Sequence, residues 1–574
     1  MPDQNRVPTR ASAVIFRGKA TLLQARRAVV DRKNGVRRFD QGEATAFPFV
    51  WAQISVPLWS KVEGAEATLE RGKVHNMRRA VVRLDGVVVP AHQIFSFWKH
   101  VGRATRKRGF AKGRLLREGC LVPAMGGGLC ALSNALYELA LRADFEIVER
   151  HAHSQRVIGS VAVLSGRDAT VAWNYVDLRF RAKQAMLIEA RIGRDQMVIS
   201  FRGQSARPTG SVDVTPRDFV PLAMVVDERG ALDVTAHSCA SCGVETCFRH
   251  DKKSVTRGQR AWLWDELWPE FQEFWQGNHE GNDVLLLPLD GAKWRAARYH
   301  FPLLTGQVAH FATFPTLQRA IMLRRAGNGG GRAALGLRGD QTLAAHYERH
   351  LSADITHLVI AQSLLPFLWR SGALGGRGFD VLATRLPLQI MHDRLDAAFA
   401  RHPDCVSLGD FRAPCEIVEA ESCALRQARR IITPHAEVAT LCGKQSLLLP
   451  WKMPPRREFR RGDALIFPGP DLARKGTSIA RAAGRALDMN FQLWDASAPN
   501  PLDGAAIVVA PSIIEERPQK LLLALASGVP VVASAACGLG AREGVTLVAP
   551  DDEAALSNAI RAALTLPVEP AVSL

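Results

Sequence analysis

The chain has 574 residues, of which 47% are hydrophobic and 23% charged, a composition that excludes a disordered, collagen-like or membrane-bundle protein. At about 150 residues per domain, this length predicts several domains rather than one core. The net charge is +18, and residues 1–120 contribute +15 of it, with 24 Lys and Arg against 9 Asp and Glu.

The basic N-terminal region favours an anionic partner. An acidic membrane surface fits better than nucleic acid, because aromatic side chains do not interleave with the basic ones in a stacking pattern. Ordinary surface charge explains the same excess, since net charge informs partners rather than fold. We therefore expect this region either to contact the anionic inner face of a membrane peripherally or to have no specific partner.

The longest uncharged run, Leu521–Ala541, has the length of a membrane span, but Ser527, Gly528 and Pro530 divide it into helix, turn and strand. The N-terminus lacks the long apolar region of a secretory signal. Ten cysteines are too few for a disulfide scaffold in a chain of this length. These features predict a cytoplasmic protein, in contact at most with the inner face of the membrane.

The predicted elements, taken in chain order, give a multidomain protein. Residues 1–45 form a basic lead segment with no core of their own. Residues 46–212 alternate short apolar runs with polar turns, which predicts an α+β domain with one clear helix at Cys130–Ala143. Strands are expected at Val81–Pro90, Glu146–Arg150, Ala169–Tyr175 and Met197–Phe201.

Residues 213–280 predict a small Cys-rich connector that ends in a Trp-rich helix. Four candidate metal ligands lie close together in it: Cys239, Cys242, Cys247 and His250. Three thiolates and an imidazole suit tetrahedral zinc, and the same ligands suit an iron–sulfur cluster. The alternative is a set of unconnected thiols in a linker. We expect a metal site that holds zinc or an iron–sulfur cluster.

From residue 281 onward, strands and helices alternate, which predicts a doubly wound α/β fold. Residues 281–455 and 456–574 form two Rossmann-like halves that join near Trp451–Arg460. Ligands of such sheets bind at the carboxyl ends of the strands, so we expect a binding cleft between the halves.

A cysteine opens the helix predicted at 130–143 and follows a run of glycines at 126–128. A thiol in a first helical turn lies near unpaired N–H groups and the positive end of the helix dipole, which lower the pKa of a thiol. His153 and Asp168 follow in the order expected of a base and an orienting carboxylate. His151 competes with His153, because residues two apart on a strand face the same way. The alternative is a structural cysteine beside glycines that only turn the chain.

Ordered motifs between about residues 58 and 180 resemble the VanW family, named from vancomycin-resistance clusters. They are GKVHNMRRA, FSFW followed by VGRATRKRGF, GGGLCALSNALY, ERHAHS and GRDATVAWNYVDLRF. One position departs from the family, since Ala131 stands where many relatives have Gln after the cysteine. The resemblance implies a VanW-like domain and supplies no reaction, so a role for Cys130 and His153 remains a hypothesis from the residues alone.

Residues 283–565 resemble the GT-B glycosyltransferases of the retaining family 4 type. The motifs PGPDLARKG, PSIIEERPQKLLLALASGVPVVAS and VAPDDEAALSNAI carry this resemblance. It places Glu515 at the first acidic position of the E-x7-E motif, as a catalytic residue, and Lys475 with Gly469 at the donor. It implies a nucleotide-sugar donor, whose diphosphate meets cations and helix N-termini, and no metal requirement.

Two positions of this part depart from the family pattern. Leu523 stands where the second glutamate of E-x7-E is expected, and Pro470 stands where an arginine usually follows the glycine. The first departure removes a ribose-binding carboxylate and the second removes a diphosphate cation. The resemblance therefore leaves open a changed donor, a lost activity, or a Rossmann-type domain kept for binding.

The predicted function is a glycosyltransferase fused to a VanW-like domain, in cell-envelope or surface-glycan metabolism, with a glycan or lipid-linked acceptor. One alternative is a non-catalytic envelope scaffold or binding protein. The other is a thiol hydrolase centred on Cys130, with His153 as its base and Asp168 as the orienting group.

Overall fold

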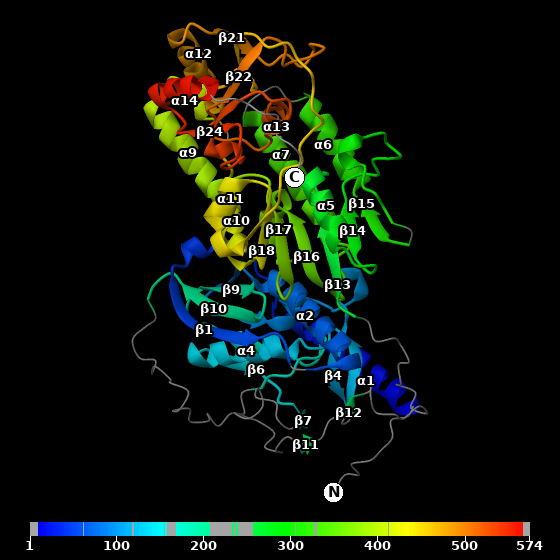
Figure 1. The fold of residues 1–574 in the computed structure, drawn as a ribbon. Coiled ribbons are helices and arrows are strands. Elements are labelled where there is room, and N and C mark those ends of the chain that lie inside the picture. Colours follow the sequence, from blue (N-terminus) through cyan, green and yellow to red (C-terminus); the bar gives the residue numbers. More distant parts are fainter. Residues whose placement is uncertain are drawn as a thin grey trace. The chain divides into compact units, whose positions relative to one another are not determined.

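The chain divides into two compact units. Unit 1 comprises residues 1–259, 351–356 and 371–377, and unit 2 comprises residues 260–350, 357–370 and 378–574. Figure 1 shows the helices and strands of both units in a computed structural model. The model describes residues 10–60, 62–117, 120–153, 155–157, 168–206, 232–234, 237–238, 257–304, 306–325, 330–410 and 412–565.

Unit 1 combines small, mostly antiparallel sheets with helices (Figure 1). Its largest sheet has the antiparallel strand order β1-β10-β9-β2. Two further sheets have the orders β3-β8-β6 and β12-β5-β4, and β11 pairs with β7. The elements are α1 (Arg10–Lys33), β1 (Phe49–Pro57), α2 (Gly64–Leu84), β2 (Val87–Val89), β3 (Ile94–Ser96), α3 (Phe97–Val101), β4 (Lys112–Arg117), β5 (Cys120–Met125), α4 (Cys130–Arg142), β6 (Glu146–Glu149), β7 (Gln155–Val157), β8 (Arg179–Arg181), β9 (Met186–Ile192), β10 (Gln196–Gly203), β11 (Leu232–Val234) and β12 (His237–Ser238).

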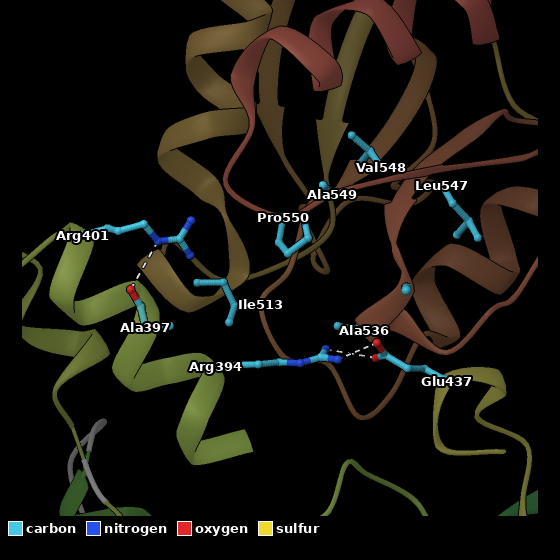
Figure 2. Close-up of a pocket in the computed structure, with 11 residues that line it drawn as sticks. Arg394, Ala397, Arg401, Glu437, Ile513, Ala536, Leu547, Val548, Ala549 and Pro550 are labelled. Atoms are coloured by element: carbon cyan, nitrogen blue, oxygen red, sulfur yellow. Dashed lines mark hydrogen bonds and ion pairs between the residues drawn. The ribbon is translucent and has the colours of Figure 1, made fainter. Parts of the chain in front are cut away.

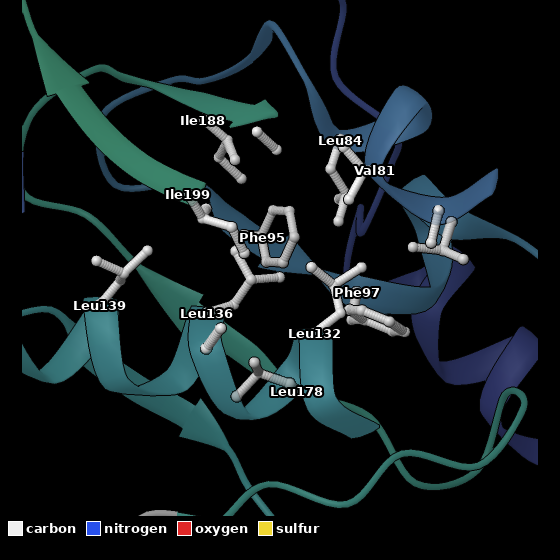
Figure 3. Packing of buried hydrophobic residues seen from close by; sticks show 14 of the residues in the cluster. Val81, Leu84, Phe95, Phe97, Leu132, Leu136, Leu139, Leu178, Ile188 and Ile199 are labelled. Carbon is white, nitrogen blue, oxygen red and sulfur yellow. The ribbon is translucent and has the colours of Figure 1, made fainter. Parts of the chain in front are cut away.

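Helix α4 buries one face of leucines in the core of unit 1. Leu132, Leu136 and Leu139 are all fully buried, and they recur at the spacing that places side chains on one side of a helix. Figure 3 shows them among the other members of the same cluster, which include Val81, Leu84, Phe95, Phe97, Leu178, Ile188 and Ile199. The predicted helix at 130–143 is therefore confirmed, and its opposite face is left for polar contacts.

The turn before α4 packs directly against the backbone of strand β4. A Cβ atom on Gly127 would lie 2.4 Å from the backbone carbonyl of Gly113, closer than real Cβ contacts allow. Asn76 of helix α2 holds the turn, because its Nδ2 donates hydrogen bonds to the carbonyl oxygens of Gly127 and Ala111, both at 3.0 Å. This contact fixes where α4 begins and hence where Cys130 lies.

Unit 2 contains two parallel sheets whose strands alternate with helices (Figure 1). The first sheet has the order β15-β14-β13-β16-β17-β18-β19, and the second has the order β21-β20-β22-β23-β24. The predicted alternation of strands and helices in the C-terminal part is thus confirmed. The elements are β13 (Gln259–Leu263), α5 (Pro269–Asn278), β14 (Val284–Leu287), β15 (Val308–Phe311), α6 (Thr313–Arg325), α7 (Gly330–Glu348), β16 (Ile355–Ala361), α8 (Leu365–Arg370), β17 (Gly378–Leu382), α9 (Leu388–Arg401), α10 (Cys415–Gln427), β18 (Arg430–Thr433), α11 (Ala436–Cys442), β19 (Ser446–Leu448), β20 (Ala464–Phe467), the 3-10 turn η8 (Ala473–Lys475), α12 (Thr477–Ala486), β21 (Asn490–Leu493), β22 (Ala505–Ala510), α13 (Gln519–Ala526), β23 (Val531–Ser534), β24 (Val545–Val548) and α14 (Glu553–Thr565).

The Trp-rich segment at the end of the expected connector belongs to the first sheet of unit 2. The prediction of a single connector helix there is wrong, because residues 259–263 form strand β13 between β14 and β16 and only residues 269–278 form a helix. Trp262 and Trp264 are 1% exposed each. A buried parallel strand has both faces covered, so it carries large apolar side chains without alternation.

Three other predictions for unit 1 are corrected. The expected strand at 81–90 is instead the end of helix α2 followed by the short strand β2, and no strand forms at 169–175. The lead segment, expected to lack a core, forms helix α1 and buries Asp31, Val36 and Phe39. The expected strands at 146–150 and 197–201 are present as β6 and β10.

The uncharged run at 521–541 folds as most of helix α13, a turn and strand β23, as predicted. Gly528 lies in the turn with a φ of +80°, a conformation that glycine adopts without strain. Among the helices of the described ranges, none is both long and apolar enough to cross a membrane.

We predict that Gly127→Ala destabilises unit 1 by about 1–3 kcal/mol or more, because the added methyl group has no room beside the β4 backbone. Gly18→Ala is the matched control, since nothing lies within 4 Å of a Cβ there and the residue is in the interior of α1. The control should be neutral or stabilise by up to about 1 kcal/mol. Urea-dependent hydrogen exchange of peptides from α4 measures both variants, and equal protection in the two would contradict the packing argument.

Candidate functional site

The first candidate site lies in unit 1, where Cys130 begins helix α4. Its side chain is half-buried, and its Sγ is 3.7 Å from Thr170 Oγ1. The His153 ring and the backbone N–H of Val171 also lower the pKa of this thiol. Polar groups from the chain beyond α4 therefore act on one sulfur atom.

The second member of this site, His153, is held by a carboxylate. Asp168 Oδ2 accepts hydrogen bonds from the His153 ring Nδ1 at 2.8 Å and from the His153 backbone N–H at 2.6 Å. Arg150 Nη2 donates to Asp168 Oδ1 at 3.0 Å. Asp168 is 5% exposed. With Nδ1 bonded to the carboxylate, Nε2 is the ring nitrogen left for proton exchange with a neighbouring group.

The three groups shift one another's pKa values. Burial alone would raise the pKa of the Cys130 thiol, but the hydrogen bond and charge of His153 outweigh burial and lower it. Burial would lower the pKa of His153, but hydrogen bonds with Asp168 and Cys130 raise it to about 9. Burial likewise opposes ionisation of Asp168, and its bonds to His153 lower its pKa. The pKa of the thiol thus falls and that of the imidazole rises, the two directions expected when a cysteine and a histidine form an ion pair.

The structure chooses between the two histidines that spacing left open. His151 has an exposed ring that contacts Glu149 at 3.1 Å, away from the thiol. His153 bonds to Asp168, which lies two residues before Thr170, the neighbour of Cys130 Sγ. The histidine that completes the site is thus selected by its carboxylate partner rather than by position in the chain.

Side chains on the polar face of α4 hold the segment that carries Asp168. Asn134 Oδ1 accepts a hydrogen bond from the Ala169 backbone N–H at 2.7 Å, and Ser133 Oγ donates to the Ala169 carbonyl at 2.6 Å. Both residues lie one turn beyond Cys130, on the face opposite the leucines. Thr170 was not predicted as a thiol neighbour, although its position two residues after Asp168 was a usable signal.

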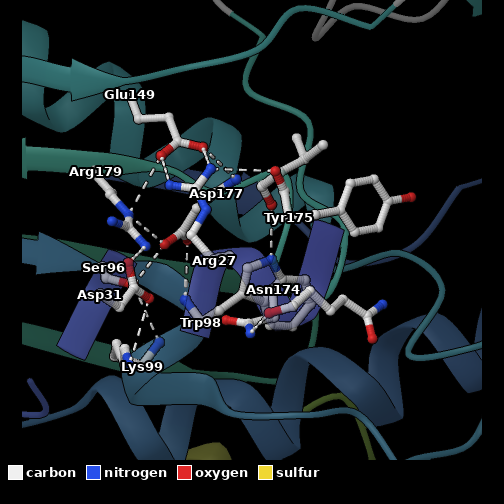
Figure 4. A network of polar contacts seen from close by, with 12 residues as sticks. Arg27, Asp31, Ser96, Trp98, Lys99, Glu149, Asn174, Tyr175, Asp177 and Arg179 are labelled. Carbon is white, nitrogen blue, oxygen red and sulfur yellow. Dashed lines mark hydrogen bonds and ion pairs between the residues drawn. The ribbon is translucent and has the colours of Figure 1, made fainter. Parts of the chain in front are cut away.

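A buried ionic network holds the end of strand β6, from which the chain leads to the site (Figure 4). Arg179 Nη2 lies 2.7 Å from Asp31 Oδ1, and its Nε lies 2.8 Å from Asp177 Oδ2. Arg27 of helix α1 forms two parallel hydrogen bonds to Glu149, at 2.5 and 2.6 Å. Because Glu149 ends strand β6, the network fixes the start of the segment that leads to Arg150 and His153.

The second candidate site lies in unit 2, at the carboxyl end of the second sheet. Lys475, in the turn η8 after strand β20, pairs with Glu515, in the loop after strand β22, and Nζ is 2.9 Å from Oε2. Both side chains are largely buried, with 15% and 20% of their surface exposed. The structure therefore brings together the two residues that the sequence analysis carried over from the glycosyltransferase pattern.

Close backbone packing holds this ion pair in place. Gly476 has a φ of +79°, and a Cβ there would lie 2.5 Å from the Pro511 carbonyl oxygen. Ile513 N–H donates to the Arg474 carbonyl at 3.0 Å, so the two loops are also hydrogen-bonded. Gly469 lies beside both Phe467 and Lys475, since a Cβ on it would be 2.9 Å from the phenyl ring. The predicted donor residues thus share one edge of the sheet.

The loop after strand β23 meets a histidine from the first sheet. His435, which follows β18, lies with its Nε2 3.1 Å from the carbonyl oxygen of Ala536. A Cβ on Gly538 would lie 2.5 Å from the His435 ring, so this loop requires glycine for the contact. Burial lowers the pKa of His435, which leaves it neutral near pH 7. His435 was not predicted from the sequence, although a polar residue directly after a buried strand indicates a position at the carboxyl edge of a sheet.

An open pocket of about 580 Å³ adjoins these loops (Figure 2). Helix α9 contributes Arg394 and Arg401, and Arg394 pairs with Glu437 at 2.6 Å. The opposite wall is apolar and comprises Ile513, Ala535, Ala536, Leu547, Val548, Ala549 and Pro550. The pocket therefore combines cations on one side with the carboxyl ends of strands β23 and β24 on the other.

The two positions that depart from the family pattern have identifiable surroundings. Leu523 is partly buried and packs against the core of unit 2. One turn earlier on helix α13, Lys520 Nζ donates to the Pro468 carbonyl at 2.5 Å and lies 5.4 Å from the centre of the Trp494 ring. A cation therefore reaches the loop in which Pro470 replaces the expected arginine.

The predicted metal ligands Cys239, Cys242, Cys247 and His250 lie outside the described residues. Within the ranges that are described, side chains of His, Cys, Asp and Glu form no group that could hold a metal ion. The expectation of zinc or an iron–sulfur cluster thus stays a prediction from the sequence.

Comparisons with known proteins match both parts of the chain. The family model described as VanW like protein matches residues 72–202, and the one described as Glycosyl transferases group 1 matches residues 466–565. The uncharacterized protein YoaR of Bacillus subtilis (strain 168) is 30% identical over 173 residues, which cover 29% of this chain and 56% of YoaR. The vancomycin B-type resistance protein VanW of Enterococcus faecalis (strain ATCC 700802 / V583) is 28% identical over 142 residues, which cover 24% of this chain and 51% of that protein. The chain spans about half the length of these relatives.

Solved structures of glycosyl-transferring enzymes show a weak similarity. A sucrose-phosphate synthase from Thermosynechococcus elongatus aligns with 54% of this chain and 90% of its own, at 14% identity and a TM-score of 0.32. A UDP-forming alpha,alpha-trehalose-phosphate synthase from Burkholderia vietnamiensis aligns with 55% of this chain and 92% of its own, at 11% identity and a TM-score of 0.29. TM-scores of this size are too low to establish a common fold.

The family matches coincide with the two candidate sites. Cys130, His153 and Asp168 lie within the VanW match, and Lys475 and Glu515 lie within the glycosyl transferase match. The chain therefore joins a VanW-like domain at residues 72–202 to a glycosyl transferases group 1 domain at residues 466–565.

Proposed function

We propose that unit 2 transfers a sugar from a nucleotide-sugar donor, with the GT-B arrangement of two Rossmann-like halves. The observation that carries the proposal is the Lys475–Glu515 pair at the carboxyl edge of a parallel sheet, inside the glycosyl transferases group 1 match. Ligands of α/β sheets bind at this edge. The adjoining pocket, with its apolar wall and two arginines, supplies space for part of the nucleotide.

The pair has a chemical role in such a transfer. When the bond between sugar and diphosphate breaks, negative charge develops on the leaving diphosphate. The Lys475 ammonium offsets that charge, and Glu515 accepts hydrogen bonds from sugar hydroxyls. In the absence of a donor the two side chains form an ion pair, with Lys475 Nζ 2.9 Å from Glu515 Oε2. This ion pair keeps both side chains at the same edge of the sheet.

Lys520 supplies a cation in place of the arginine that Pro470 replaces. Its ammonium contacts the Pro468 carbonyl, which lies two residues before the missing arginine. Burial lowers the pKa of Lys520, although the charge of Glu515 opposes this shift. An anionic diphosphate beside Lys520 favours its charged form. We therefore assign Lys520 to donor binding together with Lys475.

The stereochemistry of transfer, the acceptor and the cellular location are proposed from the family resemblances and the charge of the N-terminal region. Retention of configuration at the transferred sugar is the outcome expected for the family 4 type. The VanW match suggests that the acceptor is a cell-envelope or surface glycan, or a lipid-linked precursor. A basic N-terminal region would bring the protein to an anionic membrane surface on the cytoplasmic side.

We predict that Lys475→Ala lowers sugar transfer or donor hydrolysis by about 10²–10³-fold, because it removes the cation that faces the leaving group. The assay screens UDP-, GDP- and dTDP-sugars for product release and for thermal shift. The matched control is Lys444→Ala, which removes an exposed lysine from the turn before β19. Equal turnover in the two variants would remove Lys475 from the site, and no shift with any donor would refute nucleotide-sugar binding.

We predict that Lys520→Ala raises the dissociation constant of the nucleoside diphosphate product about tenfold, or about 1.4 kcal/mol, through loss of one phosphate contact. Isothermal titration with the diphosphate of the preferred donor measures this constant. Glu543→Gln, which alters an exposed acidic residue before β24, is the control for general electrostatics. If Lys520→Ala leaves the dissociation constant of the diphosphate unchanged, this lysine does not replace the arginine that is missing at Pro470.

A further inference from the structure

Unit 1 contains a group of reactive side chains that sugar transfer does not use. We propose that Cys130, His153 and Asp168 form a second active site, a thiol hydrolase that cleaves an ester or amide through an acyl-thioester on Cys130. The proposal goes beyond the glycosyltransferase assignment and does not depend on it.

The geometry assigns one role to each residue. Cys130 is the nucleophile, and its Sγ lies 3.7 Å from Thr170 Oγ1, two residues after Asp168. Asp168 orients the ring of His153, the proton donor and acceptor, through the 2.8 Å contact to Nδ1. The bonds of Ser133 and Asn134 to Ala169 hold this segment against the start of α4, so nucleophile, base and orienting group are gathered as covalent acyl transfer needs.

The sulfur is activated rather than merely buried. Cys537 of unit 2 provides the comparison, because burial raises the pKa of that thiol to about 12. Burial also opposes ionisation of the half-buried Cys130, yet the pKa of that thiol falls because of His153. A structural thiol would behave as Cys537 does. The contrast within one chain therefore points to a nucleophile at Cys130.

The start of helix α4 offers donors for a developing oxyanion. Within the described residues, the backbone N–H groups of Gly128, Leu129 and Cys130 have no hydrogen-bond partner, and no side chain caps the helix. The glycine turn that presents them is fixed by Asn76. N–H groups at a helix start beside a nucleophile stabilise the negative oxygen of a tetrahedral intermediate.

The reaction balances with these groups alone. The thiolate attacks the acyl carbonyl carbon and forms the C–S bond, while the carbonyl electron pair moves onto oxygen. The intermediate collapses, the C–O or C–N bond breaks, and the imidazolium of His153 gives its proton to the leaving alcohol or amine. Water then attacks the thioester carbon while His153 takes a proton from it. The C–S bond breaks, the acid is released, and the thiolate of Cys130 and the imidazolium of His153 remain as at the start.

Alkylation and acylation of the full-length chain test the proposal. We expect iodoacetamide to label Cys130 at a rate whose midpoint lies well below pH ~8.5, because the thiolate persists there. With p-nitrophenyl acetate we expect a burst of one equivalent of p-nitrophenolate and the mass of one acetyl group on the peptide that contains Cys130. Cys130→Ser, which keeps the size and polarity of the side chain, should abolish both.

The variants separate a catalytic histidine from a structural one. His153→Ala should move the alkylation midpoint above that of the parent protein and remove the burst, because burial then acts on the thiol alone. His151→Ala, which alters the exposed histidine two residues away, should leave both unchanged. Hydrogen exchange over α4 checks that each variant is folded.

Three results would overturn the proposal: a Cys130 that does not react in the folded parent protein, a midpoint at or above pH ~8.5, or equal behaviour of the two histidine variants. Rapid labelling of Cys130 without acylation by the ester would also overturn it, since that result describes a reactive thiol without acyl transfer.

Discussion

The position of the thiol site depends on the burial of one guanidinium among carboxylates. Arg179 is almost fully buried and contacts Asp31, Asp177 and Glu149, each from a different part of the chain. Loss of Arg179 would leave the buried Asp177 without the cation that pairs with it, at a cost of roughly 3–5 kcal/mol. The network therefore holds together helix α1 and the strands β6 and β8. It also sets the direction in which the chain leaves β6 toward Arg150, and so the place of the histidine ring.

Where a pattern is local, the sequence was sufficient to predict the structure. The helix that begins at Cys130, the alternation of strands and helices beyond residue 281, and the division of the apolar run at 521–541 all follow from periodicity and from turn residues. The order Cys130, His153, Asp168 was accessible from the residues, whereas Lys475 and Glu515 were accessible only through the family resemblance. In these segments local preference and tertiary environment favour the same conformation.

Where the outcome depends on distant partners, the sequence was insufficient. The segment that forms β13 has a high content of tryptophan and no alternation, and only its neighbours β14 and β16 make it a strand. Helix α2 ends in the run VVRL, whose β-branched residues favour a strand until they pack in the core of unit 1. The choice of His153 over His151 needed a carboxylate fifteen residues away. Thr170 joined the site through a segment that has no regular secondary structure.

The two units do not correspond to two uninterrupted stretches of the gene. The chain crosses between them after residues 259, 350, 356, 370 and 377. Within unit 1, Arg78 of α2 donates to the carbonyl oxygen of Gly375 at 2.6 Å, and Arg71 lies 3.4 Å from Asp354. A gene truncated after residue 259 would therefore encode a VanW-like domain that lacks part of its own fold. Recombination that moved unit 1 into another protein would have to carry these two short segments as well, which ties the inheritance of Cys130, His153 and Asp168 to that of unit 2.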